Sequence, residues 1–236
     1  MSHDRPIVDL LVPVQGPDAS YGPVLAGLPR DLLRHVFVVH TGTTTESLPP
    51  ATSVPAGLKV LATPRRGFGA AVLRGMEHLQ ELEPRPAVVV VMASDGSDDP
   101  ADVPALLRPV LKGGYDLVIG SRMLGPGRGA SLSPLNRYGN VVAVQLIRVV
   151  YGYSYSDLST FFAIRFPALV ALGMHDYGAG FATELRVKAL KVDLRVAEVP
   201  AARRRRRAED QAETLRSKLD AGYKSLYQIL RNATIR

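Results

Sequence analysis

A run of valines followed by polar residues is the best candidate for chemistry in this 236-residue sequence. Val88–Met92 is apolar and mostly β-branched, which is typical of a strand buried on both faces in a parallel sheet. The run stops at Ser94, and Pro100 begins a predicted helix over 101–111. A carboxylate at the C-terminal end of such a strand lies where open α/β sheets bind ligands. Asp95 is therefore a candidate ligand-binding residue; alternatively, it only forms a turn.

Two further polar residues follow predicted strands. Arg122 comes after a strand that ends in Gly-Ser, so its guanidinium could bind a phosphate through two hydrogen bonds. The alternative is an ordinary surface arginine. His40 ends an earlier strand and could contact a base or a phosphate, although a lone histidine there is more often a turn residue.

The composition excludes several classes of protein. The absence of Cys excludes disulfides, thiolate zinc sites and a Cys nucleophile, and it fits a cytoplasmic protein. No apolar run approaches the roughly 20 residues that cross a bilayer, so we expect a chain that is soluble or at most peripheral at the inner face of the membrane. The net charge of +7 indicates an anionic partner, but much of it lies in Arg203–Arg207. Nucleic acid is disfavoured because no aromatic residues interleave that run.

The first 120 residues alternate between predicted strands and helices. Helices are expected at about 22–34, after Gly67 and over 101–111. This alternation is the signature of a doubly wound, mostly parallel sheet. The expected strands cover 7–13, 35–40, 58–62, 88–92 and 116–120.

The pattern changes after Arg122. The Gly/Pro/Ser-rich loop at 124–134 is long for a connector, which favours an active-site loop. Beyond it we expect helices at about 136–151, 167–172 and 181–191, a strand at 195–200 and a helical tail over 208–231. The apolar stripe of this basic tail suits packing on the core or, alternatively, an anionic membrane surface. The stripe consists of Leu215, Leu219, Tyr223, Leu226 and Leu230.

Seven short motifs occur in a fixed order between about residues 6 and 207: Gly67–Ala71, Val91–Pro100, Asp116–Arg122, Arg137–Asn140, Asp157–Arg165, Gly180–Glu184 and Glu198–Pro200. Together they resemble the family 2 glycosyltransferases of the GT-A fold, close to the dolichyl-phosphate mannose synthases. The stretch Asp-Leu-Val-Ile-Gly-Ser-Arg matches that group almost letter for letter. Each motif is weak alone, and their order carries the resemblance.

The resemblance implies a single-domain α/β fold, a GT-A-like (Rossmann-like) three-layer sandwich with a mostly parallel central sheet. The expected domain covers 1–207, with a nucleotide-sugar half at 1–122 and an acceptor half at 123–207, followed by a C-terminal amphipathic helix at 208–236. The implied activity is inverting transfer of a sugar from a nucleotide-sugar donor to a polyprenyl-phosphate or small-molecule acceptor. Mg²⁺ or Mn²⁺ would neutralise the leaving diphosphate.

The resemblance also implies roles for individual residues. Asp95 would bind the metal. Asp157 would take the proton of a hydroxyl acceptor, or only orient a phosphate acceptor that is already ionised; alternatively, Asp157 is an N-cap or turn residue. The donor and its phosphates would contact Pro13, His40, Gly67, Ser94, Asp95 and Arg122. The acceptor side would include Arg137, Phe161, Glu184, Arg203 and Arg205.

Several acids of the family pattern are missing on the donor side. His40-Thr41-Gly42 stands where relatives carry two aspartates, and Ala93 replaces the first acid of an Asp-x-Asp pair. The losses leave three readings open: an active transferase with an atypical donor and metal site, a degenerate non-catalytic binding protein, or a sugar nucleotidyltransferase. The nucleotidyltransferase would require a Gly-rich phosphate loop after the first strand, and Gln15-Gly16-Pro17 is a poor one. Retention of Asp95, Arg122, Arg137, Asp157 and Glu184 favours the active transferase.

Overall fold

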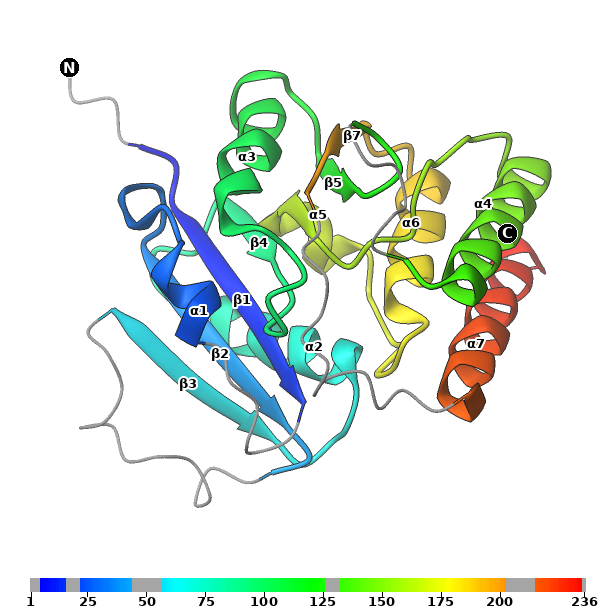
Figure 1. Cartoon of the computed structure of the whole chain (residues 1–236). Helices are drawn as coiled ribbons and strands as arrows, with labels where there is room; N and C mark the ends of the chain where they lie inside the picture. The colour runs from blue at the N-terminus through cyan, green and yellow to red at the C-terminus, as the bar shows by residue number, and fades with distance from the viewer. Residues whose placement is uncertain (1–4, 16–21, 44–56, 126–131, 203–214, 235–236) are drawn as a thin grey trace.

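The chain folds into one seven-stranded sheet with helices on both faces (Figure 1). The computed structural model describes residues 5–15, 22–43, 57–125, 132–202 and 215–234. The strands are β1 (Val8–Gln15), β2 (His35–Thr41), β3 (Leu58–Thr63), β4 (Val88–Val91), β5 (Leu117–Ser121), β6 (Phe162–Arg165) and β7 (Val196–Pro200). The α-helices are α1 (Gly22–Ala26), α2 (Phe68–Gln80), α3 (Val103–Lys112), α4 (Pro134–Tyr151), α5 (Phe166–Ala171), α6 (Phe181–Lys191) and α7 (Leu215–Thr234). The 3₁₀ turns η1 (Arg30–Leu32) and η4 (Pro100–Asp102) complete the described elements.

The strand order in the sheet is β3-β2-β1-β4-β6-β5-β7. Only β6 is antiparallel to its neighbours β4 and β5; the other pairs are parallel. The chain builds outward from β1 in one direction through β2 and β3, and in the other direction from β4. The C-terminal ends of β1 and β4 therefore form a topological switch point, where open α/β sheets bind ligands.

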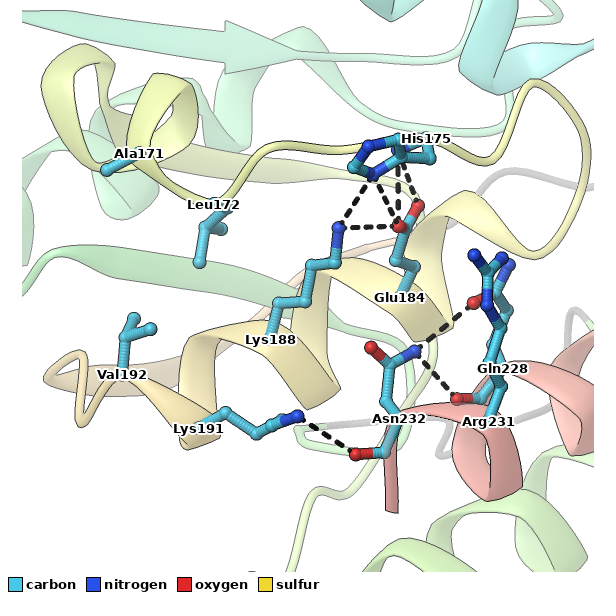
Figure 2. A pocket seen from close by; sticks show the side chains of 10 residues that line it. All are labelled: Ala171, Leu172, His175, Glu184, Lys188, Lys191, Val192, Gln228, Arg231 and Asn232. Atoms are coloured by element: carbon cyan, nitrogen blue, oxygen red, sulfur yellow. Dashed lines mark hydrogen bonds and ion pairs between the residues drawn. The ribbon is translucent and has the colours of Figure 1, made fainter. Parts of the chain in front are cut away.

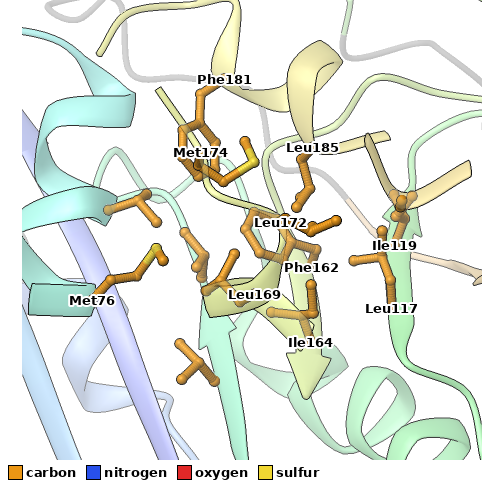
Figure 3. Packing of buried hydrophobic residues seen from close by; sticks show 14 of the residues in the cluster. Met76, Leu117, Ile119, Phe162, Ile164, Leu169, Leu172, Met174, Phe181 and Leu185 are labelled. Atoms are coloured by element: carbon orange, nitrogen blue, oxygen red, sulfur yellow. The ribbon is translucent and has the colours of Figure 1, made fainter. Parts of the chain in front are cut away.

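Alternating strand residues pack on opposite faces of the sheet, which produces two hydrophobic cores. Val88 and Val90 face α1 and α3, whereas Val89 and Val91 face α2, α5 and α6. Figure 3 shows the second core, in which Phe162 and Ile164 of β6 lie beside Leu117 and Ile119 of β5. Because both faces are covered, β4 is apolar throughout, and the predicted three-layer α/β fold is confirmed.

The first strand and the first helix differ from the sequence prediction. β1 continues past Pro13 to Gln15. Beyond Leu11 the strand pairs only with β2, so the proline ring of Pro13 does not disrupt pairing with a second strand. The helix expected over 22–34 consists only of α1 and η1. Gly27 and Pro29 interrupt it, since glycine weakens a helix and proline disrupts its interior.

The described part of the apolar stripe on α7 faces solvent, whereas one of the two interpretations of the sequence had this stripe packing on the core. Tyr223, Leu226 and Leu230 are exposed, whereas Ile229 and the polar Gln228 are buried. Residues 208–214 and the side chains of Leu215 and Leu219 lie outside the part that the structure describes. Across the described residues, no helix combines the length and the apolar character of a membrane span.

Replacing Phe162 by alanine tests the packing of the antiparallel strand. Phe162 has no exposed surface, so Phe162→Ala should cost about 3–5 kcal/mol of the free energy of unfolding. Val192→Ala is the control, since Val192 is 56% exposed and should change stability by less than about 0.5 kcal/mol. Urea unfolding measures both. Equal losses in the two variants would contradict the packing described for β6.

Candidate functional site

The candidate site lies along the edge where the parallel strands end. β2 ends just after His40, the turn with Asp95 follows β4, and Arg122 follows β5. The structure thus places these three residues along one edge of the sheet, and their role in binding stays a prediction. Residues 16–21, 44–56, 126–131 and 203–214 follow β1, β2, β5 and β7 in the chain. Whatever they contribute to this edge lies outside the described residues.

The turn after β4 holds Asp95 in place. The Asp95 Oδ1 atom accepts a hydrogen bond from the Ser97 backbone N–H at 2.9 Å, and Gly96 adopts a positive φ of 69°. The buried Asp98 closes the turn, because its Oδ2 accepts from the Ala93 N–H at 2.9 Å. Asp98 was not among the predicted site residues. Its position directly after the Asp-Gly-Ser run was the available signal.

Among the described residues at this edge, Asp95 is the candidate carboxylate for a divalent cation. In the described part of the chain, no group of three or more His, Asp or Glu residues could hold a metal. Mg²⁺ and Mn²⁺ accept one or two protein carboxylates and fill their remaining positions with phosphate oxygens and water. The buried Ser97 Oγ has no hydrogen-bond partner in the described residues, so this turn keeps one polar group to offer beside Asp95. These residues fit a metal that binds together with a phosphate-bearing ligand.

Arg122 and Asp157 form a buried ion pair. The Arg122 guanidinium donates to both Asp157 oxygens, Nε to Oδ2 at 2.6 Å and Nη2 to Oδ1, and the Arg122 backbone N–H donates to Oδ2 at 2.9 Å. The two side chains are 12% and 0% exposed. Asp157 is thus fully engaged by Arg122, and this geometry supports a positioning role more directly than proton transfer.

The segment that carries Asp157 is held by β7 and α4. Glu198 accepts from the Ser156 N–H and hydroxyl, each at 2.8 Å, and from the Asp157 N–H at 3.3 Å. The Ser156 hydroxyl also lies 2.6 Å from the Ser121 hydroxyl at the end of β5. Asn140 Oδ1 accepts from the Leu158 N–H at 2.8 Å. The motif residues Asn140 and Glu198 therefore position this segment rather than a substrate.

The buried Arg186 also holds the segment that carries Asp157. Arg186 is fully buried and donates to the carbonyl oxygens of Asp157, Ser159 and Ala182 at 3.1, 2.6 and 2.7 Å. Burial lowers the pKa of Arg186, and the nearby Tyr155 and Asp157 oppose that shift. No sequence motif pointed to Arg186, because a lone arginine in an amphipathic helix usually faces solvent.

The glycines at the start of α2 allow close packing against a later loop. A Cβ on Gly69 would lie 1.9 Å from the Asp176 carbonyl oxygen, and one on Gly67, at φ 117°, would lie 2.3 Å from that of Tyr177. The Ala70 N–H donates to the Tyr177 carbonyl at 2.8 Å. The loop at 176–178 thus packs against the first turn of α2, and this packing accounts for a glycine at position 67. The contact of Gly67 with the donor stays a prediction.

Glu184 holds that loop. Its carboxylate is 3% exposed and accepts from the His175 N–H at 3.1 Å and from Lys188 Nζ at 2.8 Å (Figure 2). It also accepts from the Asp176 N–H at 2.8 Å. Beside it, side chains of α5, α6 and α7 line a cavity of about 300 Å³. Glu184 therefore shapes the loop and also lines the cavity, and its contact with an acceptor stays a prediction.

The remaining predicted residues separate into core, surface and undescribed positions. Phe161 is fully buried against α3 and Gly120, so its ring belongs to the core rather than to an acceptor surface. Pro13 is buried within β1, and His40 is 3% exposed in β2. Arg137 is exposed near the start of α4, and Ser94 is half-buried in the turn beside Asp95. Arg203 and Arg205 lie outside the described residues.

Comparison with known proteins identifies the family. The model of glycosyl transferase family 2 matches residues 25–173. The chain belongs to glycosyl transferase family 2. It is 31% identical over 192 residues to an uncharacterised glycosyltransferase of Mycobacterium tuberculosis, covering 81% of this chain and 83% of that protein. It is 28% identical over 142 residues to an undecaprenyl-phosphate mannosyltransferase of Micrococcus luteus, covering 58% of this chain and 57% of that protein.

Solved structures agree on the fold of this family member. Glucosyl-3-phosphoglycerate synthase of Mycobacterium tuberculosis superposes with a TM-score of 0.73 at 21% identity, over 98% of this chain and 82% of that one. Mannosyl-3-phosphoglycerate synthase of Rubrobacter xylanophilus gives 0.67 at 18% identity, over 96% and 73%. The predicted resemblance, the GT-A-like fold and the assignment to the transferases are confirmed.

The ion pair predicts a large cost when its carboxylate is neutralised. Asp157→Asn leaves the Arg122 charge unpaired and should lower the free energy of unfolding by about 3–5 kcal/mol. The control is Glu77→Gln, which removes the exposed Arg74–Glu77 pair at 3.7 Å and should cost no more than about 1 kcal/mol. Denaturant unfolding compares them. A cost below 1 kcal/mol for Asp157→Asn would contradict a tightly engaged pair.

The close approach at α2 predicts opposite effects at two glycines. Gly69→Ala should destabilise the fold by at least about 1–3 kcal/mol, because the Asp176 carbonyl must move. Gly139→Ala on α4 has open space around its Cβ and should be neutral or stabilise by up to about 1 kcal/mol through helix propensity. Thermal unfolding of the two variants is the measurement; a neutral Gly69→Ala would show that the loop does not rest on α2.

Proposed function

We propose that this protein transfers a sugar, with inversion, from a nucleotide-sugar donor to an acceptor that carries a phosphate, either a polyprenyl phosphate or a small molecule. The observation that carries the proposal is the position of Asp95, which lies in a hydrogen-bonded turn at the switch point, with Arg122 after β5 on the same edge. Family membership supports glycosyl transfer as the reaction. Residues 1–122 supply the donor half, 123–207 the acceptor half, and 208–236 the C-terminal helix.

The chemistry is a displacement at the anomeric carbon. The bond from this carbon to the diphosphate oxygen breaks, an acceptor oxygen bonds to its opposite face, and the nucleoside diphosphate leaves with the electron pair. Negative charge builds on the leaving diphosphate, and a bound Mg²⁺ or Mn²⁺ would neutralise it as a Lewis acid. Asp95 would hold that ion, and Ser94 and Gly67 would border the phosphates. A solved structure of the Mycobacterium tuberculosis synthase contains Mn²⁺, uridine diphosphate and phosphoglyceric acid.

The state of Asp157 favours a phosphate acceptor over an alcohol. A hydroxyl nucleophile must lose a proton to a base, whereas a phosphate oxygen is already ionised at neutral pH. Asp157 already accepts three hydrogen bonds from Arg122, which suits orientation rather than proton removal. Asp157 would therefore fix Arg122, and Arg137, Arg203 and Arg205 would supply further positive charge. The relative in Micrococcus luteus named for undecaprenyl phosphate supports this acceptor class.

The donor pocket would recognise its base without the family's acids. His40 stands on β2 where relatives place an aspartate, and it pairs in register with Val14 of β1 and Ala62 of β3. With the imidazole buried at the strand end, the ring would contact the base or ribose through one of its nitrogens. This proposal gives the enzyme an altered nucleotide preference, and Pro13 would shape the same wall.

Neutralising Asp95 should abolish metal-dependent donor binding. Thermal unfolding is followed with nucleoside diphosphates, nucleoside triphosphates and nucleotide sugars, each with and without Mg²⁺ or Mn²⁺. The wild-type chain should gain stability only when metal and nucleotide are both present, and Asp95→Asn should lose this gain. The matched control is Asp193→Asn, an exposed loop residue at φ 54°, a conformation that asparagine tolerates.

Each alternative gives a different result in the same panel. No stabilisation by any nucleotide, with or without metal, would favour the degenerate non-catalytic reading. Stabilisation by nucleoside triphosphates alone would favour a sugar nucleotidyltransferase. An undiminished metal-dependent shift in Asp95→Asn would remove Asp95 from the site and contradict the proposal.

A further inference from the structure

A cavity of about 300 Å³ lies between helices α6 and α7. Its lining comes from α6, from α7 and from residues 171–175 (Figure 2). Of the described residues, Asp95, Arg122 and Asp157 lie outside this lining, so the cavity is distinct from the candidate transfer site. The volume is at the lower end of the range for pockets that hold small ligands. We call it the α6–α7 cavity.

The α6–α7 cavity carries more positive than negative charge. Among the described residues that line it, Glu184 is a carboxylate and three are cations: Lys188, Lys191 and Arg231. Glu184 and Lys188 form an ion pair at 2.8 Å, so their charges offset each other. With His175 neutral, the lining therefore has an excess of two positive charges, which come from Lys191 and Arg231.

The two surplus cations lie where α6 meets α7. Lys191 Nζ donates to the Asn232 carbonyl at 3.0 Å, which holds the ammonium group of α6 against α7 (Figure 2). Arg231 precedes Asn232 in α7 and is exposed. The partial negative charge of a helix end acts only over the last turn, whereas the lining of α6 extends back to Glu184. An anion in the cavity would thus accept charge-assisted hydrogen bonds from both helices.

An apolar wall lies beside these cations and is supplied by Leu172 and Val192. An organic phosphate monoester matches both parts of the lining. Its carbon chain would meet the apolar wall, and its phosphate carries about −1.5 to −2 charges at pH 7, close to the excess of two positive charges. We propose that the α6–α7 cavity is a regulatory site for a small organic phosphate, with the phosphate group on Lys191 and Arg231.

A loop connects the cavity to the start of α2. Gln228 lines the cavity and donates to Asp176 Oδ2 at 2.8 Å. The carbonyl of the next residue, Tyr177, accepts from the Ala70 N–H at 2.8 Å. A ligand that holds α7 against α6 would therefore steady this loop and the first turn of α2. Gly67, which precedes that turn, is predicted to border the donor phosphates, so the effect on donor binding rests on the proposed function.

Isothermal titration of the full chain tests the binding site without any nucleotide. n-Hexyl phosphate should bind at least ~10-fold more tightly than inorganic phosphate, which lacks the apolar part, and than hexan-1-ol, which lacks the charge. Lys191→Met/Arg231→Met should weaken the binding of n-hexyl phosphate at least ~10-fold, because it removes both surplus cations. The matched control is Arg108→Met/Lys112→Met, which removes two exposed cations from α3 and should bind like the wild type.

Amide hydrogen exchange tests the connection to α2. Saturation with n-hexyl phosphate should slow exchange of the Ala70 amide at least ~3-fold. The control is the Arg34 amide before β2, which donates to the Val8 carbonyl at 2.8 Å and should exchange at an unchanged rate. Asp176→Ala should bind n-hexyl phosphate like the wild type but lose the slowing, because its contact with Gln228 is removed. Far-ultraviolet circular dichroism and thermal unfolding confirm that each variant folds.

Four results would overturn the proposal. Undetectable binding of n-hexyl phosphate, or equal binding by the two double variants, would remove the site. Inorganic phosphate that binds as tightly as n-hexyl phosphate would indicate an adventitious ion only. Unchanged exchange of the Ala70 amide at saturation would remove the regulatory role. Neither measurement uses a nucleotide, so these failures are distinct from a failure of the sugar-transfer proposal, which the metal-dependent thermal shift decides.

Discussion

The site depends on one buried ion pair, Arg122 with Asp157. Taking two charges out of water is costly, and the cost is offset only when each charge is fully hydrogen-bonded. Here the backbone N–H of Arg122 adds a third bond, Glu198 holds the segment through Ser156, and Arg186 supports it through carbonyl oxygens. These contacts hold the end of β5, strand β7 and the loop before β6 in a fixed arrangement. Because β5 ends at the edge where Asp95 lies, the same contacts fix one part of that edge.

The sequence was most informative where burial alone determines local structure. Apolar, valine-rich runs located β1, β2, β4 and β5 to within a few residues, because a strand covered on both faces must be apolar throughout. The central strand β6 was not predicted, since its four residues form no such run. It was least informative where side chains meet across long sequence distances. Asp157 was predicted to be catalytic and Glu184 to lie on the acceptor side. Nothing in the sequence indicated that Asp157 is engaged by Arg122, or Glu184 by loop N–H groups and Lys188, since the pattern shows residue types and not partners. The periodicity of α7 indicated an amphipathic helix, but it did not show which side of the helix is buried. In the structure the side chain of Gln228 is buried because Asp176 accepts its hydrogen bond.

The edge proposed to bind the donor differs from the segment around Asp157 in how many of its polar groups are already hydrogen-bonded. Among the described residues, the segment around Asp157 is held by charged and polar contacts. The described part of the proposed donor edge presents the candidate carboxylate of Asp95, a buried serine hydroxyl and a buried histidine. One carboxylate gives a divalent ion too few ligands, so a metal held there would depend on the phosphates of its ligand for most of its coordination. Metal and nucleotide binding would therefore be strongly coupled.

The position of β6 between β4 and β5 has a consequence for synthesis on the ribosome. β4 is made early, but its second edge is completed only by Phe162–Arg165, some seventy residues later, and the carbonyls that meet the start of α2 come from 176–178. Until then the nascent chain presents a valine-rich strand with an unpaired edge, the kind of surface that invites aggregation. The N-terminal half can therefore not complete its fold as it emerges, and chaperone contact during translation would fall in the interval between β4 and β6.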